Sequence, residues 1–334
     1  MDLWECALSF MHSQVLLTAE ELGVFESMAS CPRRIAEIAA ATGLPEDSAE
    51  RLLAALCALD IVKKLPDGRF ANGREAAEHL VCGRPGYIGA LFPHIKHALY
   101  PTWQYFKEAL YEQAPQWERA FNREVPPNER MYADPLALRH FMEGMHAITY
   151  QAAAELAVDA AELSQIDSLV DVGGASGAFV IALAERFASL RGTVLDLPPV
   201  KPIAEDFLRK HNVVDRVHFH EADFWEDPIP LGADAYALGF ILHDWDCQGG
   251  SLLLHKIADA TPPGGLLIVG EYLLNDDKTG PLYVVRSDLN MLVAARGRER
   301  SALEYGEWLH ACGFTLQQIY RTSKGKCFLI ARRG

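Results

Sequence analysis

The chain has 334 residues, of which half are hydrophobic and 23% are charged, and its formal net charge is −14. This length suits two domains, and the composition is that of a globular protein with a sizeable core. The negative charge repels polyanions at long range, so we expect neither nucleic acid nor an anionic membrane surface to be a partner.

The seven cysteines are scattered along the chain, with no CxxC pair and no Cys/His spacing typical of a zinc site. They indicate reduced thiols in place of a disulfide framework. Asp2 and Glu5 stand where a signal peptide carries basic residues, and no apolar run approaches the roughly 20 residues that span a bilayer. We therefore expect a soluble, cytoplasmic protein.

The N-terminal part of the chain predicts helices and a hairpin. Residues 3–25 are apolar at helical spacing on more than one face, so this helix must be buried in its own domain or against a second subunit. We therefore predict a homodimer formed through it. Residues 33–73 predict two helices joined at Gly43, then a hairpin, which is a winged-helix pattern. The second helix region carries four acidic residues against Arg51, which favours a structural role over DNA binding.

The pattern of apolar residues changes in the second half of the sequence. Residues 80–165 are mostly helical, whereas from Ser168 onward short apolar strands alternate with helical stretches. This alternation predicts an α/β domain with a doubly wound, mostly parallel sheet. Two closing strands, 314–322 and 326–333, predict an antiparallel hairpin at one edge. We place the domain boundary in a long connecting helix, with domains at residues 1–155 and 156–334.

A glycine-rich turn follows the first strand of the predicted sheet. Residues 171–177, DVGGASG, then open a helix, and glycines at such a turn let the backbone approach a ligand closely. Asp196 ends the next strand, where an acid can accept hydrogen bonds from ribose hydroxyls. A helix cap ahead of Pro198 explains Asp196 equally well. Together, the turn and the acid indicate an adenosine-containing cofactor, either a dinucleotide or S-adenosylmethionine.

The later strands also end in polar residues. Asp223 follows the third strand and can accept the adenine amino hydrogen while Phe224 lies against the ring. His243 follows the fourth strand and Glu271 ends the fifth. The carboxyl ends of parallel strands form the ligand crevice of open α/β sheets. Ionisable groups at so many strand ends would build a poor apolar core, so they predict a functional site.

The motifs DVGGASG, LDLP, EADFW, LHDWD and PPGGLLIVGEYLL follow one another along the chain. In this order and spacing the sequence resembles the small-molecule O-methyltransferases of the caffeic acid and acetylserotonin type, in their bacterial branch. The resemblance covers essentially the whole chain. It implies a Rossmann-like methyltransferase domain preceded by an all-helical, winged-helix dimerisation domain. It also implies S-adenosylmethionine as cofactor, S-adenosylhomocysteine as its product, a small-molecule acceptor and no metal.

The resemblance implies roles for individual residues. His243 would be the general base, with Glu271 and Glu299 as the acids that flank it. The residues implied in cofactor binding are Asp171, Gly173, Gly174, Gly177, Asp196, Leu197, Asp223 and Phe224. The residues implied in lining the acceptor pocket are Phe141, Met145 and Met291.

The sequence departs from the family pattern at two positions. The family often has a lysine four residues before the histidine, where this chain has Gly239, which suggests an altered cofactor contact. A histidine sometimes found in the pocket helix is replaced by Ile148. The second change removes a polar contact to the acceptor and argues against plant-type phenolic substrates.

The expected reaction is methyl transfer to a phenolic or enolic hydroxyl of a small, aromatic molecule. A phenol has a pKa of about 10, so a neutral imidazole within hydrogen-bond reach is a suitable base. Glu271 or Glu299 on the other ring nitrogen would fix the tautomer of His243. The alternative role for His243 is to cap the following helix. The sequence also leaves open a C- or N-methyltransferase, a non-methylating enzyme of the same fold, and a metabolite-sensing winged-helix regulator.

Overall fold

The computed structural model describes residues 2–122 and 131–334. The chain divides into two compact units. The N-terminal unit comprises Met1–Ala98 with Glu143–Ala147, and the C-terminal unit comprises Leu99–Met142 with Ile148–Gly334. None of the helices in the described ranges combines the length and the apolar character needed to cross a bilayer.

The N-terminal unit contains the helices and the hairpin that the sequence predicts. Its elements are α1 (Leu3–Glu21), α2 (Val24–Ser27), α3 (Ile35–Thr42), α4 (Glu46–Ala58), β1 (Val62–Lys64), β2 (Phe70–Asn72), α5 (Arg74–His79), η1 (Gly89–Leu91) and α6 (Phe92–His94). Helix α1 begins after Asp2, whose side chain accepts a hydrogen bond from the N–H of Trp4 at 3.2 Å. Gly43 ends α3 with a φ of 72°, a conformation that glycine adopts readily. Strands β1 and β2 are antiparallel.

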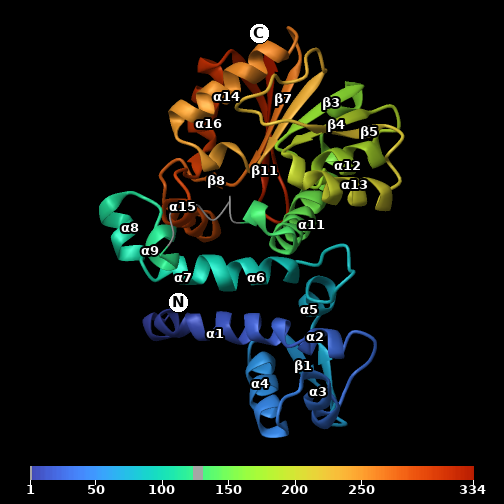
Figure 1. Ribbon diagram of the computed structural model, residues 1–334, viewed down its shortest axis with the longest axis vertical. Coiled ribbons are helices and arrows are strands. Elements are labelled where there is room, and N and C mark those ends of the chain that lie inside the picture. The colour runs from blue at the N-terminus through green and yellow to red at the C-terminus, as the bar shows by residue number, and fades with distance from the viewer. Residues whose placement is uncertain (1, 123–130) are drawn as a thin grey trace. The chain divides into compact units, whose positions relative to one another are not determined.

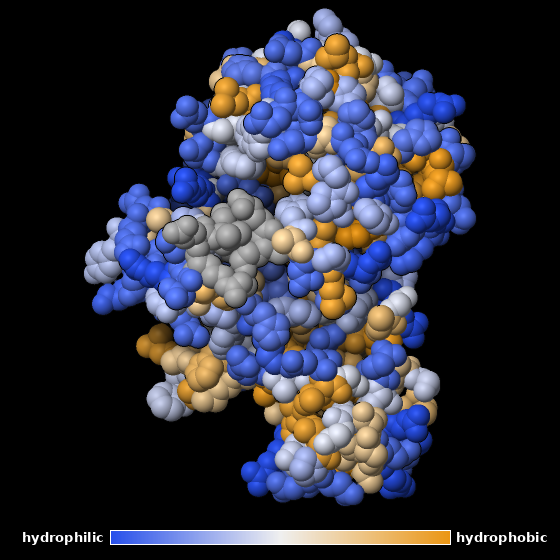
Figure 2. Space-filling model, viewed as in Figure 1, coloured by the Kyte–Doolittle hydropathy of each residue, from blue (hydrophilic) through white to orange (hydrophobic). Residues whose placement is uncertain are grey.

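Apolar side chains of α1 divide between the core and the surface of the N-terminal unit. Leu17 lies in a buried cluster with Phe25 and Leu53. At the other end of the helix, Leu3 and Trp4 are 86% and 68% exposed. Figure 2 shows hydrophobic residues on the surface over this end of α1. The helix therefore has an apolar surface that its own unit does not cover.

Helices connect the first unit to the sheet. They are η2 (Ile95–Leu99), α7 (Tyr100–Trp103), α8 (Phe106–Glu112), α9 (Trp117–Phe121), α11 (Pro135–Asp159) and η3 (Ala161–Gln165). The long helix α11 begins after Asp134, whose carboxylate accepts hydrogen bonds from the N–H groups of Leu136 and Ala137. Residues of α11 belong to both units.

The C-terminal unit is built on a seven-stranded sheet (Figure 1). Its strands are β3 (Ser168–Val172), β4 (Arg191–Asp196), β5 (Val217–Glu221), β6 (Ala235–Gly239), β7 (Leu266–Glu271), β10 (Phe314–Arg321) and β11 (Cys327–Arg333). The order is β10-β11-β7-β6-β3-β4-β5, and β3 to β7 are parallel. Strand β11 pairs antiparallel with both β7 and β10. The predicted doubly wound sheet with an antiparallel edge hairpin is confirmed.

Helices and short elements complete the C-terminal unit. They are α12 (Ala178–Arg186), η4 (Pro198–Val200), α13 (Lys201–Lys210), η5 (Leu242–Asp244), α14 (Cys247–Ala260), β8 (Leu273–Leu274), α15 (Leu282–Ala294), β9 (Arg300–Ser301) and α16 (Ala302–Ala311). Alternate residues of each central strand enter two separate cores. Ala237 of β6 packs in the cluster that contains α12, and Leu238 packs in the cluster that contains α14. Because both faces of the sheet are covered, the strands are nearly continuous apolar runs that end in polar residues at one edge.

Candidate active site

The three residues predicted to be catalytic meet in one buried cluster. His243 lies in η5 just after β6, Glu271 ends β7, and Glu299 directly precedes β9. His243 Nδ1 is 3.0 Å from Glu299 Oε1 and 3.6 Å from Glu271 Oε2. Both glutamates are fully buried. One imidazole nitrogen and one carboxylate oxygen from each glutamate lie within 4.8 Å of one another. The sheet therefore brings two carboxylates to the same side of one imidazole.

Glu271 also holds the backbone that carries His243. Its Oε1 accepts hydrogen bonds from the N–H groups of Ile241 and Leu242, at 3.1 and 3.0 Å. Its Oε2 is buried without a hydrogen bond, 3.6 Å from the imidazole. One carboxylate thus fixes the turn after β6 and places its charge beside the ring.

Glu299 is oriented by residues of α15 that the sequence analysis missed. Ser287 Oγ donates to Glu299 Oε1 at 2.7 Å, and the N–H of Glu299 donates to Asp288 Oδ1 at 2.8 Å. These two residues lie on a helix that carries no recognisable motif, so nothing local in the sequence marks them. Ser287 therefore fixes the oxygen that contacts His243 Nδ1, and Asp288 fixes the backbone of Glu299.

The helix-capping role considered for His243 is wrong. The N-cap residue of α14 is Asp246, whose Oδ1 accepts a hydrogen bond from the N–H of Gly249 at 2.8 Å. His243 Nε2 lies 3.6 Å from Asp244 Oδ1, beyond hydrogen-bond distance. In the described part of the chain this nitrogen has no hydrogen-bond partner, so it is available to a ligand.

The electrostatics of the cluster favour a proton on the imidazole. Burial alone would lower the pKa of His243, but the negative charges of Glu271, Asp244 and Glu299 outweigh burial and raise the pKa to about 10. For Glu271, burial has the opposite effect and raises the pKa of the carboxyl to about 7, although the charge of His243 acts to lower it. A group with this proton affinity can take a proton from a weakly acidic hydroxyl.

Arg300 is a further residue that the sequence analysis did not single out. It is buried and donates to the carbonyl oxygens of Leu242 at 3.1 Å and Trp245 at 2.9 Å, on either side of His243. Its position directly after Glu299 in the sequence GRERS was the available signal. Arg300 therefore ties the segment that contains Glu299 to the segment that contains His243.

The predicted cofactor loop and Asp196 are joined by hydrogen bonds. Asp196 Oδ2 accepts from the N–H of Ala175 in the glycine loop at 2.8 Å, and Oδ1 accepts from the N–H of Leu197 at 2.7 Å. The N-cap residue of η4 is Leu197, so Asp196 does not cap that helix. Burial raises the pKa of Asp196 to about 6, although the N–H groups of Leu197 and Ala175 act in the opposite direction.

The glycine loop packs closely against Ile241 and lies near an aromatic ring. Gly173 has a φ of 70°, and a Cβ there would stand 2.5 Å from Ile241 Cδ1 and 3.6 Å from Phe224 Cε1. Gly174 follows it, and Gly177, with a φ of 76°, precedes α12. Asp223 is half-buried and accepts a hydrogen bond from the N–H of Trp225 at 2.8 Å.

The glycine loop, the buried carboxylate of Asp196 and the face of Phe224 lie at the carboxyl ends of β3, β4 and β5. They offer an acceptor for ribose hydroxyls and an aromatic surface for a purine. The side chain of Asp171 is buried at the same edge, and burial raises its pKa to about 7. These residues fit an adenosyl cofactor.

The residues predicted to line the acceptor pocket lie on two helices. Phe141 and Met145 are one turn apart on α11, and Met291 is on α15. All three are half-buried. Phe141 and Met291 belong to the C-terminal unit, whereas Met145 belongs to the stretch of α11 that groups with the N-terminal unit.

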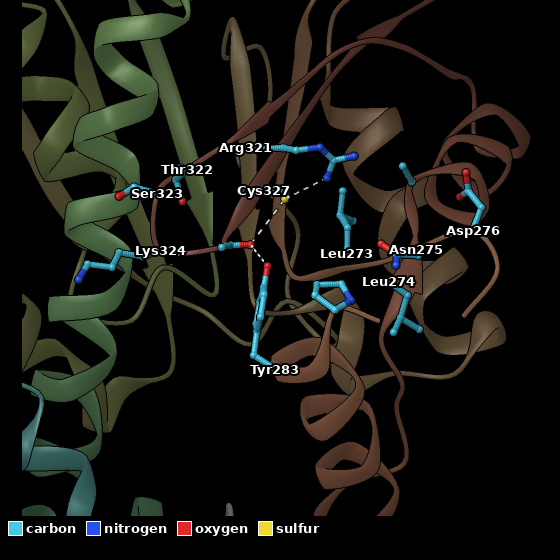
Figure 3. A pocket seen from close by; sticks show the side chains of 13 residues that line it. Leu273, Leu274, Asn275, Asp276, Tyr283, Arg321, Thr322, Ser323, Lys324 and Cys327 are labelled. Atoms are coloured by element: carbon cyan, nitrogen blue, oxygen red, sulfur yellow. Dashed lines mark hydrogen bonds between the residues drawn. The ribbon is translucent and has the colours of Figure 1, made fainter. Parts of the chain in front are cut away.

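A separate pocket of about 740 Å³ lies against the turn between β10 and β11 (Figure 3). Its lining includes Leu273 and Leu274 of β8, Tyr283 of α15 and residues 321–325. Tyr283 Oη donates a hydrogen bond to the carbonyl oxygen of Gly325 at 3.1 Å. None of the predicted site residues lines this pocket, so it is distinct from the His243 cluster.

Comparisons with known proteins identify the family of the chain. The O-methyltransferase domain model matches residues 103–315, and the O-methyltransferase dimerisation domain model matches residues 4–81. The 3-hydroxy-5-methyl-1-naphthoate 3-O-methyltransferase of Streptomyces sahachiroi is 35% identical over 312 residues, which cover 93% of this chain and 88% of that protein. The tetracenomycin polyketide synthesis 8-O-methyl transferase of Streptomyces glaucescens is 31% identical over 336 residues, covering 99% and 96%.

A comparison with solved structures indicates the same family. The crystal structure of human N-acetylserotonin methyltransferase in complex with S-adenosylmethionine matches this chain with a TM-score of 0.91 at 30% sequence identity. The match covers 99% of this chain and 96% of that one. The expected family, fold class and cofactor are thereby confirmed. The chain belongs to the S-adenosylmethionine-dependent O-methyltransferases and carries the dimerisation domain of that family.

Proposed function

We propose that the enzyme methylates a hydroxyl of a small aromatic acceptor, with His243 as the general base. The observation that carries this proposal is the buried pair of His243 Nδ1 and Glu299 Oε1 at 3.0 Å, which leaves Nε2 without a partner in the described residues. A carboxylate on Nδ1 keeps a hydrogen on that nitrogen, so Nε2 is the atom that accepts a proton.

S-adenosylmethionine supplies the methyl group as a sulfonium electrophile. The protein has to position the acceptor oxygen and remove its proton. His243 Nε2 takes that proton, and the carboxylates of Glu271 and Glu299 stabilise the imidazolium that results. The pKa of His243 is raised to about 10, which is close to the pKa of about 10 of a phenol, so the proton transfer is nearly even in free energy.

The cofactor-binding residues divide by the part of the cofactor that they suit. Asp196 accepts the ribose hydroxyls, and Asp223 accepts the adenine amino group with Phe224 against the ring. The backbone of Leu197 and the loop that contains Asp171, Gly173, Gly174 and Gly177 lies along the ligand. The support for this division is the hydrogen bond between Asp196 and the loop, together with the position of Gly173 near the ring of Phe224.

We propose that the acceptor is a fused-ring aromatic hydroxyl compound. Two relatives are named for reactions on a hydroxynaphthoate and on a tetracenomycin polyketide. Phe141, Met145 and Met291 are apolar residues suited to the faces of such rings. Ile148 adds no polar group, which agrees with an acceptor recognised mainly by apolar contact.

The enzyme is further proposed to act as a homodimer formed through its N-terminal helices. The dimerisation domain model covers residues 4–81, and α1 exposes Leu3 and Trp4 within or beside that range. Large exposed apolar surfaces on soluble proteins mark interaction sites. A second copy of the chain fits this surface because identical partners most often associate through the same patch.

The experiment that tests the function is incubation with methyl-labelled S-adenosylmethionine and a panel of phenols, naphthols and enols, followed by mass spectrometry. Amines and carbon nucleophiles with matched ring systems serve as controls. We expect the label on oxygen, with naphthols favoured over single-ring phenols. Transfer to nitrogen or carbon, with oxygen acceptors left unmodified, would replace the proposal by the C- or N-methyltransferase alternative.

A further inference from the structure

Lys326 is a buried lysine to which the reaction described above gives no role. It directly precedes β11 and is 1% exposed. Its Nζ donates a hydrogen bond to Thr149 Oγ1 of α11 at 3.3 Å and lies 3.7 Å from the centre of the Phe240 ring. An ammonium group so deeply buried costs free energy unless other groups compensate its charge.

Two glycines make room for this side chain. Gly239 ends β6, and its register partner on the neighbouring parallel strand β7 is Gly270. A Cβ at Gly239 would stand 3.4 Å from Lys326 Nζ, and a Cβ at Gly270 would stand 3.0 Å from Lys326 Cε. A Cβ at Gly270 would require the lysine to shift by a few tenths of an ångström, whereas a Cβ at Gly239 would be in ordinary van der Waals contact with Nζ. Because neither glycine has a side chain, the end of the lysine side chain can lie close to both strands here.

The backbone of Lys326 is fixed by its turn. Both the N–H and the hydroxyl of Thr322 donate to the carbonyl oxygen of Lys326, at 3.0 and 2.7 Å. Tyr283 of α15 holds the neighbouring residue Gly325 through its carbonyl oxygen (Figure 3). Lys326 therefore lies in a turn whose backbone is held by hydrogen bonds.

The charges around Lys326 belong to the active site. Asp171 is the second-last residue of β3, before the glycine loop, and Glu271 faces His243. Both carboxylates act electrostatically on the lysine. Neither forms an ion pair with Nζ within 4.0 Å, nor does any other carboxylate of the described residues. Burial lowers the pKa of Lys326 to about 8, although these carboxylates oppose the shift. An ammonium has three N–H donors, and Thr149 takes one of them.

We infer that Lys326 binds the carboxylate of the amino-acid part of S-adenosylmethionine, supplying from the turn before β11 the positive charge that Gly239 does not provide. This inference rests on the cofactor site of the proposed function and is independent of the role of His243. The carboxylate is the anionic group of this cofactor, whose sulfonium and ammonium groups are positive. Asp171, which interacts electrostatically with Lys326, offers the opposite charge, and the pair suits a zwitterionic amino acid.

The test compares S-adenosylmethionine with decarboxylated S-adenosylmethionine, which lacks only the carboxylate. Binding of each is measured by calorimetry without an acceptor, for wild type and for Lys326→Met. We expect the variant to bind S-adenosylmethionine roughly 10- to 100-fold more weakly, the effect of losing one charged hydrogen bond. Its affinity for the decarboxylated compound should equal that of wild type. Lys324→Met, two residues away and exposed, removes the same charge and should change neither affinity.

A second variant moves the charge instead of removing it. Gly239→Lys in the Lys326→Met background places an ammonium on β6 in the space that Lys326 vacates, and it should restore part of the affinity for S-adenosylmethionine alone. Equal losses for the two compounds in Lys326→Met, or no loss at all, would overturn the inference. If Lys326→Met does not fold, Lys326→Gln takes its place in the same comparison. If Asp196→Ala loses binding while Lys326→Met does not, the proposed cofactor site stands and the role of Lys326 fails.

Discussion

Glu299 Oε1 lies 3.0 Å from His243 Nδ1, although the two residues are 56 positions apart in the chain. The same oxygen accepts a hydrogen bond from Ser287 Oγ at 2.7 Å, so its position is fixed independently of the histidine. This arrangement keeps the hydrogen of a neutral imidazole on Nδ1 and leaves Nε2 as the proton acceptor.

His243→Ala should slow methyl transfer by roughly 10²- to 10⁴-fold, the usual effect of losing a positioned base. Below about pH 10 the loss should stay nearly constant, because the neutral fraction of His243 and the ionised fraction of a phenol rise together, and it should shrink only at higher pH, where the oxygen ionises without help. The measurement is kcat across a pH series, with S-adenosylhomocysteine affinity as the control for an intact site. Turnover near that of wild type on the true acceptor would refute the assignment.

The activity should rise with pH, because only a neutral imidazole accepts a proton and the pKa of His243 is raised to about 10. Glu299→Gln removes one of the negative charges that raise this pKa, so the rising limb of kcat/KM should move to lower pH. Glu307→Gln, an exposed carboxyl on α16, serves as the matched control and should leave the profile unchanged. A Glu299→Gln profile that overlays that of wild type would show that this carboxylate does not set the proton affinity of His243.

Asp196→Ala should lower the affinity for S-adenosylhomocysteine by an order of magnitude or more. The ribose hydroxyls would lose a charged acceptor, which costs about 1.5–3 kcal/mol. Titration calorimetry gives the affinity, and Asp215→Ala, an exposed aspartate, is the control. Unchanged affinity in Asp196→Ala would move the ribose contact to another residue.

The protein should be a dimer at micromolar concentration by light scattering. Trp4→Glu combined with Met11→Glu places charges on exposed apolar positions of α1 and should shift the equilibrium toward monomer. Leu303→Glu, at an exposed apolar position of the C-terminal unit, should leave the dimer intact. A wild-type monomer with α1 folded would contradict the proposed assembly.

The sequence by itself determined the sheet and the neighbourhood of the site. Apolar runs that end in Asp196, His243 and Glu271 predicted parallel strands with polar groups at one edge, and the structure has that sheet. The prediction worked because parallel strands necessarily bring their carboxyl ends to the same edge. Motifs such as DVGGASG and LHDWD are local, so their order along the chain was enough to indicate the family.

Only the tertiary structure decided which groups act on one another. The sequence left Glu271 and Glu299 as equivalent partners of His243, whereas the fold gives the hydrogen bond to Glu299 and makes Glu271 the support of the turn. Lys326 carried no motif, and it lies close to Gly270 of β7 and Gly239 of β6 because β11, which follows it, pairs antiparallel with β7. Contacts of this kind join segments far apart in the chain, and electrostatic effects depend on distance and burial, which residue order does not specify.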